Sequence, residues 1–191
     1  IADQQAIDLS NVKQVVFDEA DMLLKEGYFN DIDPITNLLN KPQYMVFSAT
    51  LENNLRYKLE QYVGNDILVI MEDKMTSHNV KHYLLDIKHK DYLECIKDFI
   101  DIKQPYLLLI FASTKQKVNE IYQFLSKENY KVGLLTGDLT SRERKNVMKR
   151  LLNDHIYILV CSDMASRGLD IPDVSDVLNV DLPNNLEFYY H

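Results

Sequence analysis

The chain has 191 residues, of which 46% are hydrophobic, and it carries a formal net charge of −8. This composition allows one large or two small cores, and no apolar run approaches the roughly 18 residues of a membrane span, so we expect a soluble globular protein without a membrane segment or signal peptide. The acidic balance argues against coating nucleic acid by bulk electrostatics, although it leaves open a protein that grips a few phosphates.

Short apolar runs alternate with longer amphipathic stretches along the chain, a pattern typical of an α/β protein with a parallel sheet. The predicted strands are Lys13–Phe17, Tyr44–Ser48, Ile67–Ile70, Tyr83–Ile87, Tyr106–Phe111, Val132–Leu135, Ile156–Cys161 and Asp176–Val180. Apolar residues at helical spacing predict helices over Lys115–Lys127, with Thr114 as the N-cap, and over Ser141–Leu152.

The apolar pattern stops between Met71 and Asn79, where polar residues follow without periodicity, and this predicts a linker. We therefore expect two domains, over residues 1–73 and 80–191, joined by a linker at 74–79. Cys95 and Cys161 lie far apart in apolar surroundings, which indicates reduced thiols in a cytoplasmic protein.

The first predicted strand ends abruptly in the acidic sequence Asp18-Glu19-Ala20-Asp21. Ligands of open α/β sheets bind beyond the carboxyl ends of strands, and a carboxylate there can hold Mg²⁺, directly or through water, that bridges nucleotide phosphates. Asp18 suits the metal, and Glu19 suits the orientation or deprotonation of the water that attacks the γ-phosphate. The alternative is that these carboxylates only favour the positive end of a helix.

Two features of the second half suit contacts with a phosphate backbone. Ser162 closes a predicted strand, so its hydroxyl and nearby N–H groups can donate to a phosphate. The most basic stretch of the chain is one predicted helix that carries Arg142, Arg144, Lys145, Lys149 and Arg150. Its alternative interpretation is a solvated helix face. Gly168 can simply supply a left-handed turn, and Arg167 can form a surface ion pair, so the local sequence alone gives neither residue a functional role.

Several segments at the ends of predicted strands resemble motifs of the DEAD-box helicases, and they occur in the order of that family. The resemblance links Asp18–Asp21 to motif II, Ser48–Thr50 to motif III, Leu109–Thr114 to motif IV, Ser162–Asp170 to motif V and Tyr189–His191 to the opening of motif VI. It spans essentially the whole chain, and its details are most similar to bacterial cold-shock DEAD-box proteins.

The resemblance implies two RecA-like domains, the first incomplete, with ATP, Mg²⁺ and RNA bound across the cleft between them. It implies that Asp18 meets the magnesium and Glu19 the attacking water. It assigns Asp170, Gly168 and His191 to ATP binding, Asp21, Ser48, Thr50 and Arg167 to coupling between the nucleotide and the RNA, and Ser113, Gly137, Arg144 and Ser162 to the RNA backbone. RNA binding is expected to be largely independent of base sequence.

The sequence departs from the family's pattern in several places. It contains no Gly-x-x-x-x-Gly-Lys-Ser/Thr phosphate loop, and its five glycines are isolated. We expect that loop to precede Ile1 and the arginines of motif VI to follow His191, so that the 191 residues alone neither hydrolyse ATP nor unwind RNA. Ser141 stands where the family usually has Gln, and Ser162 stands where Thr is commoner. We expect these two changes to affect RNA affinity and to leave the class of enzyme unchanged.

Three functions remain open from the sequence. The first is an ATP-dependent RNA helicase that unwinds or remodels short duplexes. The alternative is a non-catalytic RNA-binding scaffold with a helicase fold, which the intact Asp18-Glu19 pair disfavours. A DNA-directed or protein-remodelling ATPase of the same superfamily is the third, since RNA and DNA backbones differ mainly at the 2′-hydroxyl.

Overall fold

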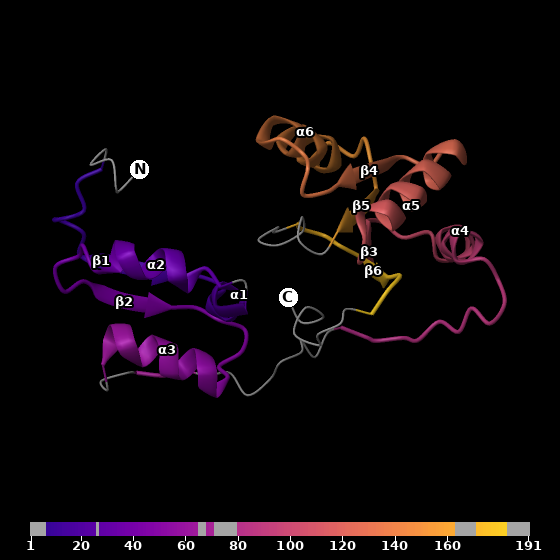
Figure 1. The fold of residues 1–191 in the computed structure, drawn as a ribbon. Coiled ribbons are helices and arrows are strands. Elements are labelled where there is room, and N and C mark those ends of the chain that lie inside the picture. Colours follow the sequence, from indigo (N-terminus) through magenta and orange to yellow (C-terminus); the bar gives the residue numbers. More distant parts are fainter. Residues whose placement is uncertain (1–6, 26, 65–67, 71–79, 163–170, 183–191) are drawn as a thin grey trace. The chain divides into compact units, whose positions relative to one another are not determined.

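The computed structural model describes residues 7–25, 27–64, 68–70, 80–162 and 171–182. The chain divides after Val80 into two compact units, called here unit 1 (residues 1–80) and unit 2 (residues 81–189). The predicted linker at 74–79 lies outside the described residues. Figure 1 shows the helices and strands of each unit.

The described residues of unit 1 form two parallel strands and three helices. The strands β1 (Gln14–Phe17) and β2 (Gln43–Val46) pair in parallel over their whole length. The chain passes between them through the helices α1 (Ala20–Lys25) and α2 (Phe29–Thr36), and it continues after β2 into α3 (Asn53–Val63). The strand–helix–strand order produces the parallel pairing, because a parallel neighbour needs a long crossover connection.

The core of unit 1 includes an aromatic cluster formed by Phe17, Phe29, Tyr44 and Tyr62, whose contacting rings have centroids 5.3 to 5.8 Å apart. Phe17 and Tyr44 come from the two strands, whereas the other two come from α2 and α3. Val16 points to the opposite face of β1 and is 53% exposed. The period-2 alternation of the strand therefore gives the sheet one packed face and one open face.

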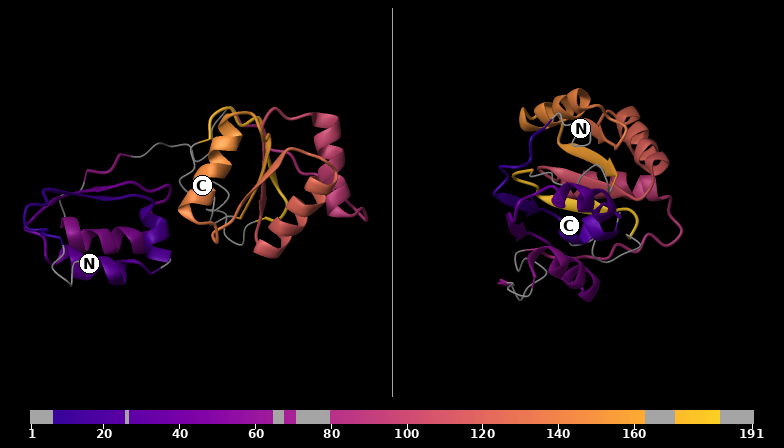
Figure 2. Two further views of the ribbon diagram at one scale, coloured as in Figure 1. Left: turned by 90° about the horizontal axis from the view of Figure 1, so that it is seen from above. Right: turned by 60° about the vertical axis from the view of Figure 1, so that its left-hand side comes forward.

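Unit 2 is built around a parallel sheet with the strand order β4-β5-β3-β6. Its strands are β3 (Leu108–Ala112), β4 (Val132–Leu135), β5 (Ile158–Ser162) and β6 (Asp176–Asn179), and its helices are α4 (Tyr92–Lys103), α5 (Lys115–Lys127) and α6 (Ser141–Leu152). The helices α4 and α5 pack against one face of the sheet and α6 against the other (Figure 2). The prediction of an α/β fold with parallel sheets is confirmed.

Sequence determines where the helices of unit 2 begin. Thr114 precedes α5, and its hydroxyl accepts the N–H of Lys117 at 3.2 Å, as predicted. Thr140 precedes α6 in a reciprocal capping box, in which its hydroxyl accepts the N–H of Glu143 and the Glu143 carboxylate accepts the N–H of Thr140. Each cap satisfies backbone donors that the first helical turn leaves without partners, which is why both helices have the predicted limits.

Two predicted strands are wrong. Residues 80–87 form no strand, and Tyr83 and Leu84 are 86% and 92% exposed. Residues 68–70 form no strand either, with Leu68 at 85% and Ile70 at 87% exposure, while Ile67 lies outside the described residues. Apolar patterning marks a segment that is compatible with a strand, but a strand forms only where a neighbour supplies partners for its N–H and C=O groups.

Candidate functional site

Polar side chains gather beyond the carboxyl ends of the strands in both units, a region called here the carboxyl edge of each sheet. In unit 1, Asp18 and Glu19 follow β1 and Ser48 follows β2. In unit 2, Gly137 follows β4 and Ser113 follows β3. Parallel strands end at the same edge, so residues that are distant in sequence come together there, where open α/β sheets bind their ligands.

The turn after β1 keeps two carboxylates near the surface. Glu19 has a φ of +50°, a left-handed conformation that is uncommon outside glycine, and its N–H donates to Asp18 Oδ1 at 3.0 Å. Ala20 is fully buried, and its N–H donates to the carbonyl of Phe47 at 3.1 Å. The left-handed residue thus separates a buried helix start from the exposed Asp18 and half-buried Glu19.

Asp21 is held at the start of α1 by a hydrogen-bond network. Only 3% of it is exposed, and its Oδ2 accepts both the N–H of Thr50, at 3.1 Å, and the Thr50 hydroxyl, at 2.8 Å. Ser48 Oγ accepts the N–H of Asp21 at 3.2 Å and donates to the Thr50 carbonyl at 2.7 Å. The structure therefore brings together the three residues that the sequence analysis linked, and it locks the turn after β1 to the segment after β2.

The acidic turn suits a divalent cation that also binds other oxygen ligands. Asp18 Oδ2 makes no hydrogen bond within the described part of the chain, so this hard oxygen is available to a hard metal. The described ranges contain no group of three or more His, Cys, Asp or Glu placed to enclose a metal. An open site of this kind fits Mg²⁺, which keeps several waters and shares its ligands with phosphates.

The carboxyl edge of unit 2 carries hydroxyl groups and an exposed glycine turn. Ser162 ends β5, where it is 8% exposed, and Gly137 lies in the exposed turn after β4. A Cβ added at Gly137 would meet no atom within 4 Å, so packing does not require glycine there. A Cβ at Gly133, within β4, would instead collide with Ile156. The backbone at Gly137 is accordingly open to a ligand, whereas Gly133 serves the core.

Ser113 lies beside Asp181, a residue that the sequence analysis did not select. Asp181 Oδ2 accepts hydrogen bonds from the N–H of Ser113, at 3.2 Å, and from the Ser113 hydroxyl, at 2.9 Å. Asp181 Oδ1 accepts a hydrogen bond from the ammonium group of Lys117. Burial raises the pKa of Asp181, but these hydrogen bonds outweigh burial and leave the pKa below its usual value. The available signal was a carboxylate placed directly after a predicted strand.

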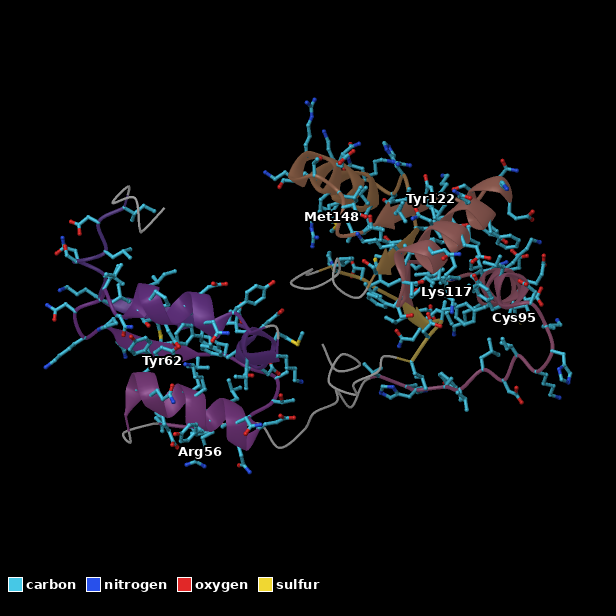
Figure 3. The ribbon with its side chains drawn as sticks, in the orientation of Figure 1. Arg56, Tyr62, Cys95, Lys117, Tyr122 and Met148 are labelled. Carbon is cyan, nitrogen blue, oxygen red and sulfur yellow. The ribbon has the colours of Figure 1, made fainter. Side chains whose placement is uncertain are left out.

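A basic surface runs along α6. Arg144, Lys145, Met148, Lys149 and Leu152 line a groove of about 590 Å³, with Ser141 and Asn153 at its two ends. Figure 3 labels Met148 on this helix. None of the cationic side chains of α6 forms a salt bridge with the described part of the chain, unlike Lys115 and Lys117 on α5. The groove therefore presents positive charge that the described residues do not neutralise.

Four residues that the resemblance assigned lie outside the described residues, namely Arg167, Gly168, Asp170 and His191. The structure brings together Asp18, Glu19, Asp21, Ser48 and Thr50 within unit 1 and places Ser113, Gly137 and Ser162 at the carboxyl edge of unit 2. Arg144 lies on α6. The site residues thus form one group in each unit.

Comparisons with known proteins agree with this geometry. A family profile described as DEAD/DEAH box helicase matches residues 1–57, and one described as helicase conserved C-terminal domain matches residues 91–191. The chain belongs to the DEAD-box helicase family. The family predicted from the motifs is therefore confirmed, and the acidic turn after β1 is the DEAD sequence itself.

Among relatives of this DEAD-box chain, the DEAD-box ATP-dependent RNA helicase CshB of Bacillus subtilis (strain 168) is 37% identical over 190 residues, which cover 98% of this chain and 43% of CshB. The ATP-dependent RNA helicase RhlB of Vibrio vulnificus (strain YJ016) is 33% identical over 98% of this chain and 44% of RhlB. The chain thus spans less than half the length of these relatives.

Solved helicase structures share the fold. Dbp5 of S. cerevisiae bound to RNA and ADP BeF3 superposes with a TM-score of 0.86 at 26% identity, covering 100% of this chain and 51% of that one. A DEAD box protein from Methanococcus jannaschii gives a TM-score of 0.57 at 29% identity, covering 99% of this chain and 51% of that protein. These likenesses support RecA-like domains in the DEAD-box chain.

Proposed function

We propose that the full-length protein is an ATP-dependent RNA helicase that grips the RNA backbone and locally unwinds or remodels RNA duplexes. The observation that carries this proposal is the acidic turn after β1, where Asp18 and Glu19 stay near the surface while Asp21 is locked beneath them. Relatives named as ATP-dependent RNA helicases and a neighbour bound to RNA and ADP BeF3 support it.

The acidic turn would serve the nucleotide. Mg²⁺, when bound, supplies charge neutralisation between the phosphates of ATP. Asp18 would hold this ion directly or through water, since its Oδ2 has no other hydrogen bond in the described structure. Glu19 would orient the attacking water and accept its proton. Asp170, Gly168 and His191 are proposed to complete ATP binding from the second domain.

The carboxyl edge of unit 2 and the basic surface of α6 would serve the RNA. Backbone N–H groups, hydroxyls and a few cations are the groups that position a nucleic acid without reading its bases. Gly137, Ser162 and Ser113 lie at this edge, and Arg144 is the half-buried cation of α6. None of the described residues that line the groove is aromatic and able to stack on a base, so we propose RNA binding that is largely independent of sequence.

The Asp21–Ser48–Thr50 network would connect the two activities. It ties the segment after β2 directly to the helix that begins within the acidic turn, so a shift of one moves the other. We propose Arg167 as its counterpart in the second domain, with domains over residues 1–73 and 80–191 and a linker at 74–79. Because all three network members lie in unit 1, they can respond to a nucleotide at Asp18.

We also propose a cytoplasmic location. Cys95 and Cys161 are both buried free thiols, which suits a reducing compartment, and burial raises the pKa of Cys161 to about 12. No helix in the described part of the chain is long and apolar enough to cross a membrane. The location is thus inferred from thiol chemistry.

Measurement of ATP hydrolysis by the purified full-length protein, with and without single-stranded RNA, tests the proposed function. We expect RNA to stimulate hydrolysis, and we expect no such stimulation by DNA of the same sequence. RNA binding without hydrolysis under any condition would favour the non-catalytic scaffold instead. Equal stimulation by RNA and DNA would favour a DNA-directed ATPase of the same superfamily.

A further inference from the structure

The hydrogen-bond polarity at Ser113 restricts what this residue can bind. Ser113 has two donors, its backbone N–H and its hydroxyl, and both point to the same Asp181 oxygen, at 3.2 and 2.9 Å. An ionised carboxylate only accepts hydrogen bonds, so the single hydroxyl hydrogen of Ser113 is committed to Asp181. Ser113 is exposed, and the lone pairs of its Oγ remain available.

Asp181 is held in place from a second side. Figure 3 labels Lys117 on α5. Its ammonium group forms a salt bridge with Asp181 Oδ1 and lies 5.4 Å from the centre of the Tyr92 ring. The side chains of Asp181 and Lys117 are only 24% and 33% exposed. Lys117 therefore both fixes the carboxylate and neutralises its charge, which would otherwise repel a phosphate backbone.

A phosphate diester is a poor partner for Ser113 in this arrangement. Its oxygens are acceptors, and Ser113 has no donor left to offer them. The sugar-phosphate backbone of RNA carries one donor that DNA lacks, the ribose 2′-hydroxyl. We propose that Asp181, positioned by Lys117, holds Ser113 as an acceptor for a ribose 2′-hydroxyl, so that this pair contributes to selection of RNA over DNA. The proposal rests on the proposed RNA-binding function of unit 2.

An acceptor role and a phosphate contact predict different losses of affinity when the Ser113 hydroxyl is removed. If Ser113 accepts from a ribose, its loss weakens only strands that carry a free 2′-hydroxyl. If Ser113 instead released Asp181 and donated to a phosphate, its loss would weaken every strand equally. The two arrangements are thus separated by changing the sugar while the phosphates stay the same.

The experiment measures equilibrium binding of the full-length protein, with an ATP analogue that resists hydrolysis, to three single strands of one sequence. These strands are RNA, 2′-O-methyl RNA, which cannot donate from the 2′ position, and DNA. For Ser113→Ala we expect RNA affinity to fall about threefold to tenfold, the effect of one hydrogen bond, with little change for the other two strands. Ser126→Ala, at the far end of α5, should leave all three affinities unchanged.

Asp181→Asn provides the second variant. Asparagine loses the negative charge and can donate to Ser113 Oγ, which releases the hydroxyl hydrogen for a phosphate. We expect DNA affinity to rise and the ratio of RNA to DNA affinity to fall by a similar factor. Asp98→Asn removes the carboxylate of the Lys90–Asp98 ion pair on the surface of α4 and should leave the ratio unchanged.

Three outcomes would overturn the inference. These are an equal loss for all three strands after Ser113→Ala, no loss for any strand, or a lower DNA affinity after Asp181→Asn. In each case the wild-type protein would still bind RNA, so the proposed function would stand. If the wild-type protein bound none of the strands, the proposed function itself would fail.

Discussion

The carboxyl edges of the two sheets have the same position in their folds and opposite chemistry. The edge of unit 1 presents the carboxylates of Asp18 and Glu19, with Asp21 buried beneath them. The edge of unit 2 presents Gly137 and Ser162, and its described carboxylates, Asp138 and Asp181, each form a salt bridge with a lysine of α5. The edge of unit 1 suits a cation that is bound to phosphates, and the edge of unit 2 suits a sugar-phosphate strand.

The difference shows how a repeated architecture acquires two functions. Parallel strands deliver the first residues of their loops to one edge, whatever those residues are. Ligand type is then decided by a few side chains, since hard oxygen anions bind Mg²⁺ and donors bind anionic or hydroxyl oxygens. Substitutions at each edge test whether that edge performs the task that its chemistry suits.

The largest expected effect is that of Glu19→Gln on ATP hydrolysis. Glutamine keeps the size of glutamate but cannot accept the proton of the attacking water at neutral pH. We expect single-turnover hydrolysis by the full-length protein to slow about 100-fold or more. ATP and Mg²⁺ should still bind because Asp18 is untouched, so RNA should dissociate slowly from the ATP-bound mutant.

Asp18→Asn is the matched comparison for Glu19→Gln. It removes the charge that faces the metal, so we expect weaker Mg²⁺-dependent binding of ATP rather than slow chemistry on bound ATP. Hydrolysis at the wild-type rate in Glu19→Gln would contradict its role as the base. Slow hydrolysis combined with rapid RNA release would keep that role and reject the long-lived RNA complex.

The next largest effect is expected from Asp21→Ala, which removes the acceptor for two donors of Thr50. A partly buried N–H and hydroxyl would lose their charged partner, at a cost of about 3 kcal/mol in the stability of unit 1. Amide hydrogen exchange should show lower protection in β1 and α3 and unchanged protection in β3 and β5. Ser48→Ala is the control, because Ser48 is exposed and its loss should cost about 1 kcal/mol or less.

Equal loss of protection in both units after Asp21→Ala would show that the network stabilises more than its own sheet. In that case the carboxyl edges of unit 1 and unit 2 would not be independent of each other. A network confined to unit 1 should also change ATP hydrolysis more than RNA affinity. Hydrogen exchange, combined with the measurements of ATP hydrolysis and RNA affinity, therefore shows which unit Asp21 affects.

A smaller effect is expected from Lys149→Gln on RNA binding. Lys149 lines the groove on α6, whereas its neighbour Arg150 does not. If a strand lies along this groove, Lys149→Gln should weaken RNA binding severalfold and make its dependence on salt shallower by about 0.7 per lost phosphate contact. Arg150→Gln, with the same loss of charge, should do much less. Equal effects would mean that α6 acts only through its overall charge.

Local patterns predicted much of the fold. The limits of α5 and α6 match the predictions because apolar spacing and a capping threonine both act within a few residues. The prediction of a strand over Tyr83–Ile87 was wrong, because a strand depends on a neighbouring strand that the local sequence does not specify. The period of a segment is thus encoded locally, but its hydrogen-bond partner is not.

The candidate site divides in the same way. Asp18 and Glu19 were found because they are adjacent and directly follow an apolar strand. The pairing of Ser113 with Asp181 was missed because 68 residues separate them, and they meet only because β3 and β6 are neighbours in the sheet. Lys117 was missed for the same reason, since its partner becomes evident only with the strand order.

The smallest effect concerns the pH dependence of unit 1, away from its carboxyl edge. Hydrogen bonds from Lys58, at 2.7 Å, and from Tyr62 hold the pKa of Asp33 below its usual 3.8. A lowered pKa stabilises the fold above pH 3.8, and this contribution is lost as the pH falls through the folded-state pKa. The Asp33 side chain is 39% exposed, so solvent screening keeps the contribution below about 1 kcal/mol. We expect Asp33→Asn to reduce hydrogen-exchange protection of α3 slightly at pH 7, and this difference from wild type should shrink as the pH falls below 3.8 and through the folded-state pKa. Asp31→Asn, on the same helix, should show no such convergence. A difference that stayed constant with pH would mean that Asp33 acts through packing rather than through its charge.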